Sequence, residues 1–289
     1  MATRTDPRKQ LRNPLDDNDD GTMPSVLDAV GPGHVAGQPD TFGGIITWTW
    51  SLTPIRTAAP TPTLFLQEAG DTTAISVNDL HQGSIGDCFL LASIGELALW
   101  HPDAIQRMIH GNANGTETVT LYRPLSSGAS QAVAVTVTNS FPSYSVNNGT
   151  NQCVANGMKE IWPQVLEKAV ATLCGSYGAI ANGGSPVTAM QELTGQPATA
   201  MAARSVTLAR LQSALSSGEL VVMGTAASAH LPYGLVGGHA YMFEGLKTVN
   251  GATMVQLGNP WGSSYNPSLI PLSGLAASGI VEVDFGRLA

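Results

Sequence analysis

Gln82–Ile94 has the sequence QGSIGDCFLLASI. Its small and polar residues predict a tight loop, and the apolar run after Cys88 has helical spacing. The Cys88 thiol is therefore expected in the first turn of a helix, where the partial positive charge of the helix end favours a thiolate. Because the thiolate is the nucleophilic form of cysteine, Cys88 is a candidate nucleophile. The alternative is a small buried cysteine at the start of a core helix.

Two polar residues near the other end of the chain match the needs of a nucleophilic thiol. His239 opens a strand-like stretch 151 residues after Cys88, and Asn259 follows 20 residues later. In papain-type enzymes His and Asn lie about 130–150 residues downstream of the cysteine. A Cys/His/Asn set repeats the logic of a Ser-His-Asp triad, in which His239 takes the thiol proton and Asn259 orients the ring. Taken singly, a histidine is more often structural, and Asn-Pro-Trp-Gly is more often a plain turn.

Two neighbouring side chains complete this candidate active site. Gln82 lies six residues before Cys88, so its amide is expected to join the Cys88 backbone N–H in binding an oxyanion. Trp261 is expected to cover the hydrogen bond between His239 and Asn259 and to exclude water from it.

In these blocks the chain resembles the catalytic core of the calpains, which are papain-like intracellular cysteine proteases. A further matching block begins with Glu160–Ala169 and continues to Gly183–Ser185, so the resemblance covers some two hundred residues. It implies a papain-like α+β fold of two lobes, with the active-site cleft between them. A helical lobe would carry Cys88, and a β lobe would carry His239 and Asn259.

The resemblance implies a cysteine endopeptidase that hydrolyses peptide bonds through an acyl-enzyme intermediate. Cys88 would be the nucleophile, His239 the general base and acid, Asn259 the orienting residue and Gln82 the oxyanion donor. Two alternatives stay open, because one fold hosts several chemistries. One is another acyl transfer on the same triad, such as transamidation, and the other is a calpain-like binding module that has lost catalysis. The substrate would be a protein or peptide.

The resemblance also implies substrate-binding positions. Gly183 and Gly184 would line the cleft beside the substrate backbone, because residues without a Cβ let an extended peptide approach closely. Gly238 and Trp261 would lie beside them. The chain departs from the family pattern at Phe89, where calpains usually have tryptophan.

The resemblance implies no cofactor for the chemistry but raises the question of calcium. Asp79 and Glu167 match acidic positions of one calpain calcium site, and two carboxylates suit a hard cation. The other interpretation is a loop aspartate and a glutamate on a helix face. The segment after Gly262 lacks the acidic, tryptophan-rich stretch that supplies much of a second site in the animal enzymes.

Composition limits partners and location. The 289 residues carry a formal net charge of −8, with no basic patch to neutralise phosphates, so nucleic acid is not an expected partner. The sequence contains no run of about 18 apolar residues, so it predicts no membrane span. The first residues lack the apolar segment of a signal peptide. We therefore expect a cytoplasmic protein, or one exported without a cleaved signal peptide.

The pattern predicts three regions: an irregular N-terminal extension (1–70), a helical lobe with the nucleophile (71–198) and a β lobe with His and Asn (199–289). The extension is rich in Pro and Gly, and its alternating Ile46–Trp50 predicts one strand. Helices are expected at 88–100, 161–173 and 208–215. Strands are expected at 119–122, 132–137, 220–223, 240–244, 254–257 and 280–285.

Overall fold

The computed structural model describes residues 61–67, 72–125, 128–147, 154–155 and 157–288, together with strands β1 (Asp40–Phe42) and β2 (Ile45–Thr47). The chain forms two compact units, Met1–Thr57 and Ala58–Ala289. In the first unit β1 and β2 pair antiparallel. The strand predicted at Ile46–Trp50 is present as far as Thr47, and the rest of it lies outside the described residues. The second unit holds everything that follows.

The nucleophile helix has the predicted limits. α1 (Cys88–Trp100) follows the N-cap residue Asp87, and all its residues from Phe89 to Ala98 are buried. A helix that is apolar all round packs inside a core rather than on a surface. The helix ends before Pro102, as predicted, but this proline also opens a second helix, α2 (Pro102–Met108). Proline is favoured at a first helical position because its missing N–H is not needed there.

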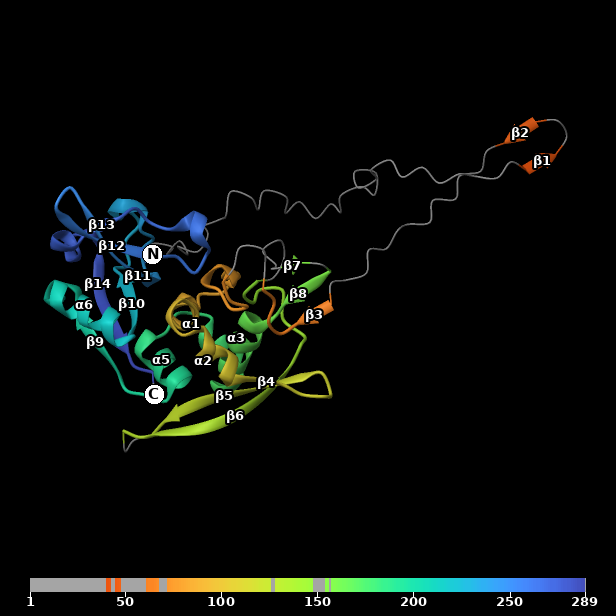
Figure 1. The fold of residues 1–289 in the computed structure, drawn as a ribbon, viewed down its shortest axis with the longest axis horizontal. Helices are drawn as coiled ribbons and strands as arrows, with labels where there is room; N and C mark the ends of the chain where they lie inside the picture. The colour runs from red at the N-terminus through yellow and green to blue at the C-terminus, as the bar shows by residue number, and fades with distance from the viewer. Residues whose placement is uncertain are drawn as a thin grey trace, which may run out of the picture. The chain divides into compact units, whose positions relative to one another are not determined.

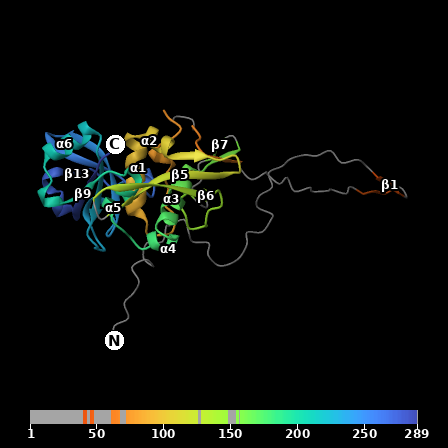
Figure 2. The same cartoon turned by 90° about the horizontal axis from the view of Figure 1, so that it is seen from below.

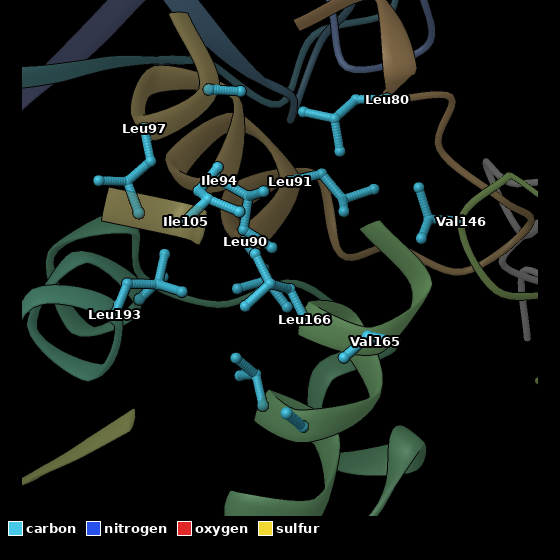
Figure 3. Close-up of a cluster of buried hydrophobic side chains, with 14 of the residues drawn as sticks. Leu80, Leu90, Leu91, Ile94, Leu97, Ile105, Val146, Val165, Leu166 and Leu193 are labelled. Carbon is cyan, nitrogen blue, oxygen red and sulfur yellow. The ribbon is translucent and has the colours of Figure 1, made fainter. Parts of the chain in front are cut away.

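The helical lobe surrounds α1 with helices and one small sheet. Its other elements are α3 (Trp162–Leu173), α4 (Tyr177–Ile180), α5 (Pro186–Thr194), and the antiparallel strands β4 (Ile109–Gly111), β5 (Thr116–Pro124) and β6 (Ser130–Thr138). Strand β8 (Met158–Glu160) pairs with β3 (Thr61–Thr63) and β7 (Val154–Ala155). Figure 3 shows the core where α1, α2, α3 and α5 meet, with labelled side chains that include Leu90, Ile94, Ile105, Leu166 and Leu193.

The β lobe is one antiparallel sheet in the order β13-β12-β11-β10-β14-β9. The strands are β9 (Ala198–Ala202), β10 (Leu220–Thr225), β11 (Ala240–Val249), β12 (Ala252–Gly258), β13 (Ile270–Pro271) and β14 (Ile280–Gly286). Helix α6 (Leu208–Ser217) begins at Thr207, whose side chain accepts the Arg210 N–H, and ends at Gly218, which has a positive φ. All strands predicted in this lobe are present.

The two lobes share the central strands of this sheet. Val222 and Met242 belong to the core of the helical lobe, whereas Val221 and Phe243 belong to the second core, because side chains alternate along a strand. In Figures 1 and 2, α1 and α5 lie between this sheet and α3. The nucleophile helix therefore packs directly against β10 and β11.

This architecture confirms the predicted α+β class, a helical region followed by a sheet. The predicted lobe boundary at 198/199 falls at the first residue of β9. Helices α2 and α5, both of which begin with a proline, were not predicted from the sequence. Among the described residues, no helix has the length and apolar character needed to cross a membrane.

One glycine sets how closely α1 approaches the sheet. A Cβ on Gly95 would lie 2.0 Å from the Met242 Sδ and 3.0 Å from its Cγ. We expect Gly95→Ala to lower the free energy of unfolding by about 1–2 kcal/mol, because overpacking a filled core costs more than the helix propensity of alanine returns. Urea unfolding measures the change, and adding Met242→Ala should recover part of it.

Gly178→Ala is the matched control. Gly178 lies in α4, and its added Cβ would meet nothing closer than the Ser176 Oγ at 3.4 Å. The free energy of unfolding of that variant should be at least as high as that of the wild type. Equal stabilities for the two variants would contradict a tight contact between Gly95 and Met242.

Candidate active site

The fold brings the predicted nucleophile to the predicted histidine strand. The Cys88 thiol, at the first residue of α1, lies beside the backbone N–H of Ala240, which acts to lower the thiol pKa. Ala240 is the first residue of β11 and follows His239 directly. Residues that are more than 150 positions apart in the sequence therefore meet where α1 begins against the sheet.

His239 is held in place by its own backbone. Its N–H donates to the Thr225 Oγ1 over 2.9 Å, and its carbonyl accepts from the Thr225 N–H over 2.9 Å. Gly238, just before it, has a φ of +64°, which favours glycine in this turn. Thr225, at the end of β10, was not recognised in the sequence, because nothing local distinguishes it from other strand threonines.

The predicted pairing of His239 with Asn259 is present. The distance from His239 Nε2 to Asn259 Oδ1 is 2.9 Å. Asn259 is oriented in turn, because its Nδ2 donates to the Tyr265 carbonyl over 3.0 Å and its Oδ1 accepts the Trp261 N–H over 3.0 Å. The Asn259 oxygen is an acceptor, so Nε2 carries the ring proton and Nδ1 is the basic nitrogen.

Aromatic rings enclose this pair. The ring centre of Trp261 lies 4.7 Å from that of His239, and Tyr241 lies edge-on at 4.9 Å. His239 is 6% exposed and Asn259 is 2% exposed. Trp261 thus lies where the sequence predicted an aromatic cover, and water is largely excluded from the hydrogen bond.

Burial controls the charges of the two reactive groups. It raises the pKa of the Cys88 thiol, and the neighbouring Asp87 charge adds to this rise, while the Ala240 N–H opposes it. Burial lowers the pKa of His239 to about 4, against the opposing effect of Asn259. Desolvation thus acts against the thiolate that the helix end is expected to favour. Before substrate binds, the neutral thiol and neutral imidazole are favoured.

A buried pair of carboxyl groups lies behind the nucleophile. Asp87 and Glu167 are both fully buried, and their carboxyl groups lie close enough for each to shift the pKa of the other. Burial raises the pKa of Asp87 to about 7, and burial together with the Asp87 charge raises that of Glu167 to about 9. The Val146 N–H donates to the Glu167 Oε1 over 2.8 Å, and Gln82 and Tyr177 lie beside the pair. Two touching carboxyl groups share a proton, which limits the negative charge next to Cys88.

Gln82 joins the nucleophile loop to the asparagine turn. Its backbone N–H donates to the Pro260 carbonyl over 2.8 Å. Its side-chain Nε2 donates to the Ile85 carbonyl over 2.8 Å, within its own loop. The Gln82 side-chain amide therefore bonds within the nucleophile loop. The role of Gln82 as an oxyanion donor stays a prediction.

The two cleft glycines are tied to the same loop. Gly183, with a φ of +87°, donates its N–H to the Gly86 carbonyl over 2.8 Å, and a Cβ there would meet open space. A Cβ on Gly184 would lie 2.4 Å from the ring of Phe89. Gly184 therefore makes room for the aromatic residue beside Cys88. The substrate-binding roles of Gly183, Gly184 and Gly238 stay predictions.

The two carboxylates predicted for calcium have different partners. The Asp79 Oδ2 accepts from the Ser76 N–H over 2.6 Å and from the Trp162 Nε1 over 3.1 Å. Glu167 faces Asp87 and the Val146 N–H. Within the described part of the chain, no three His, Cys, Asp or Glu side chains form a group that would hold a metal ion. These contacts do not fit a shared calcium site.

The pKa shifts of the reactive pair predict how Cys88 reacts with iodoacetamide. Alkylation requires the thiolate, and the raised thiol pKa keeps that form scarce near pH 7. We expect the rate constant to be low at pH 7 and to rise with a midpoint above that of an ordinary cysteine, about pH 8.5. Mass spectrometry of the Cys88 peptide follows the reaction. A high plateau below pH 8 would instead indicate a preformed thiolate–imidazolium pair.

The carboxyl pair predicts a pH-dependent stability. Because the folded pKa values lie above the unfolded values of about 4, stability present at low pH is lost as the pH rises toward 9. Glu167→Gln replaces the shared proton with a permanent N–H donor and keeps an acceptor for Val146. Relative to the wild type, the variant should gain roughly 1–2 kcal/mol of unfolding free energy between pH 5 and pH 9.

Chemical unfolding at both pH values measures this gain. Asp103→Asn is the control, because Asp103 is an exposed acid on α2 paired with Arg107. Parallel pH curves for Glu167→Gln and the wild type would show that the two carboxyl groups do not share a proton.

The comparisons with known proteins agree with this geometry. The family model described as calpain family cysteine protease matches residues 59–268. Calpain-13 of Rattus norvegicus is 28% identical over 201 residues, which are 64% of this chain and 29% of the relative. Calpain-9 of the same species is 30% identical over 198 residues, with coverages of 64% and 28%. Calpain-5 of Mus musculus is 29% identical over 236 residues, with coverages of 65% and 34%.

The aligned region spans about a third of the length of these relatives. The family model, in contrast, covers most of this chain and includes the nucleophile, histidine and asparagine blocks. The chain belongs to the calpain family of cysteine proteases.

Proposed function

We propose that this chain is an active cysteine endopeptidase that uses Cys88, His239 and Asn259. The observation that carries the proposal is the position of the Cys88 thiol beside the Ala240 N–H, which acts to lower the thiol pKa. This position brings the nucleophile to the residue next to His239, whose ring is already oriented by Asn259. The family requires no cofactor for this chemistry, so these side chains suffice.

The proposed reaction has two halves. The Cys88 sulfur attacks the peptide carbonyl carbon while His239 Nδ1 takes the thiol proton. The oxyanion lies near the Cys88 backbone N–H and the Gln82 amide. His239 then donates the proton to the leaving amine, and the C–N bond breaks to leave a thioester on Cys88. A water molecule, deprotonated by His239, hydrolyses the thioester and restores the thiol.

The neutral resting pair suits a reaction in which attack and proton transfer occur together. A basic Nδ1 in a water-poor site accepts a proton when the developing oxyanion can compensate the new imidazolium charge. The substrate is proposed to be a protein or peptide in an extended conformation beside Gly183 and Gly184. Both glycines contact the nucleophile loop or its aromatic residue, which supports this placement.

Cleavage of casein and a peptide library tests the proposal. We expect the wild type to cleave both, and Cys88→Ala to lose at least about 10³-fold of the activity, because the covalent step is lost. Cys174→Ala is the matched control. Cys174 is an exposed free thiol at the C-cap of α3, outside the proposed site. Equal activities of Cys88→Ala and the wild type would contradict the proposal.

The same assay separates the alternatives. Products joined to an added amine would indicate transamidation, and a folded wild type whose Cys88 resists a peptidyl electrophile would indicate a binding module. A chelator arm tests whether activity requires calcium, which the contacts of Asp79 and Glu167 do not favour. Activity that is unchanged by chelator would count against a calcium requirement. The cytoplasmic location stays a prediction as well.

A further inference from the structure

A buried glutamate joins the nucleophile helix to the histidine strand. Glu96 lies eight residues after Cys88 on α1 and is fully buried. Its Oε2 accepts the backbone N–H of Val221 on β10 over 2.9 Å. Its Oε1 accepts the backbone N–H of Phe243 on β11 over 2.5 Å. One carboxylate therefore bridges a helix and two neighbouring strands.

The carboxylate lies where the pairing of these strands stops. Strands β10 and β11 pair from Gly224 and Ala240 to Val222 and Met242. The next residues, Val221 and Phe243, are outside this ladder, and their N–H groups bond to Glu96 instead. Buried N–H groups without acceptors would destabilise the fold, so Glu96 replaces the missing strand partner.

Glu96 and Cys88 attach α1 to the two ends of one strand segment. Cys88 contacts Ala240, and Glu96 contacts Phe243, three residues further along β11. Eight helical residues span about 12 Å, and three strand residues span about 10 Å, so the two attachments have matching spacing. Between them, Gly95 lies flush against Met242. These contacts therefore restrict both the sliding of α1 along β11 and its separation from β11.

We propose that Glu96 is a positioning residue that holds the Cys88 thiol against His239 by fixing α1 to β10 and β11. This rests on the proposed roles of Cys88 and His239. It assigns an active-site function to a residue that touches neither of them. Two polar groups act on the pKa of its carboxyl group: the side chain of Trp100 lowers it and the charge of Glu244 raises it.

Glu96→Gln is the informative variant, because it keeps the side-chain volume. The amide has one acceptor oxygen, and its NH₂ group would face a second N–H donor. One of the two hydrogen bonds from the Val221 and Phe243 N–H groups is then lost, and α1 is expected to shift away from β11. A misplacement of about 1 Å can cost about 10²-fold in rate. We therefore expect kcat for peptide cleavage to fall by about 10²-fold, with KM within about threefold of the wild type.

A double-mutant cycle separates positioning from plain destabilisation. Cys88 alkylation by iodoacetamide is measured at one pH in the wild type, Glu96→Gln, His239→Ala and the double variant. If Glu96 acts through the alignment of Cys88 with His239, Glu96→Gln slows alkylation about tenfold in the wild-type background and less than twofold in the His239→Ala background. Equal factors in both backgrounds would overturn the proposal. So would equal alkylation of wild type and His239→Ala.

Leu97→Ala is the matched control. Leu97 is the next residue of α1 and is fully buried, but it bonds to neither strand. It should lower Tm at least as much as Glu96→Gln, while its effect on alkylation is the same in both backgrounds. If the effect of Leu97→Ala on alkylation also depended on the His239 background, the coupling would be assigned to lost stability and the proposal would be overturned.

Two further measurements test the role of Glu96 if Glu96→Gln does not fold or if the wild type cleaves no peptide. If Glu96→Gln does not fold, Glu96→Asp takes its place, because it keeps both oxygens but withdraws them from the strands. Wild-type alkylation kinetics in a folded Glu96→Asp would overturn the proposal. If the wild type cleaves no peptide, the proposed function fails, whereas the alkylation cycle still reports on Glu96.

Discussion

The packing of α1 against the sheet is the contact on which the rest of the structure depends. Every residue of this helix from Phe89 to Ala98 is buried, so the helix has no solvent face on which it could turn or slide. One side meets α2, α3 and α5, and the other meets β10 and β11. Since protein cores are close-packed, the position of the first helical residue, Cys88, follows from contacts along the whole helix.

Polar groups make this apolar contact specific. Hydrophobic burial has no direction and leaves a helix free to shift by fractions of a turn. The Ala240 N–H at Cys88 and the two N–H groups at Glu96 do have direction, and they fix α1 along β11. On the other side of the site, Thr225 and Asn259 fix the backbone and the ring of His239.

Desolvation is the common cause of the electrostatics. It favours the neutral forms of Cys88 and His239 and raises the pKa of Asp87 and Glu167. Each group is affected because the surrounding protein shields it from water. The site therefore stores little charge at rest, and the charge that catalysis needs would be created when substrate binds.

Much of the arrangement could be predicted from local patterns. The limits of α1 and the strand that starts at Ala240 follow from apolar periodicity, which a chain shows before it folds. The pairing of His239 with Asn259 followed from residue types in the right order. Helices α2 and α5 could not be identified in this way, because each starts at a proline, which also marks turns and helix ends.

The sequence by itself determined the type of fold, the order of its helical and β regions and the candidate reactive side chains, because periodicity and residue chemistry are local properties. Tertiary structure alone decided the burial that shifts the pKa values of Cys88 and His239, the proximity of Asp87 to Glu167 and the bridge at Glu96. Desolvation and contacts between distant residues exist only once the chain has folded, so no local pattern carries them.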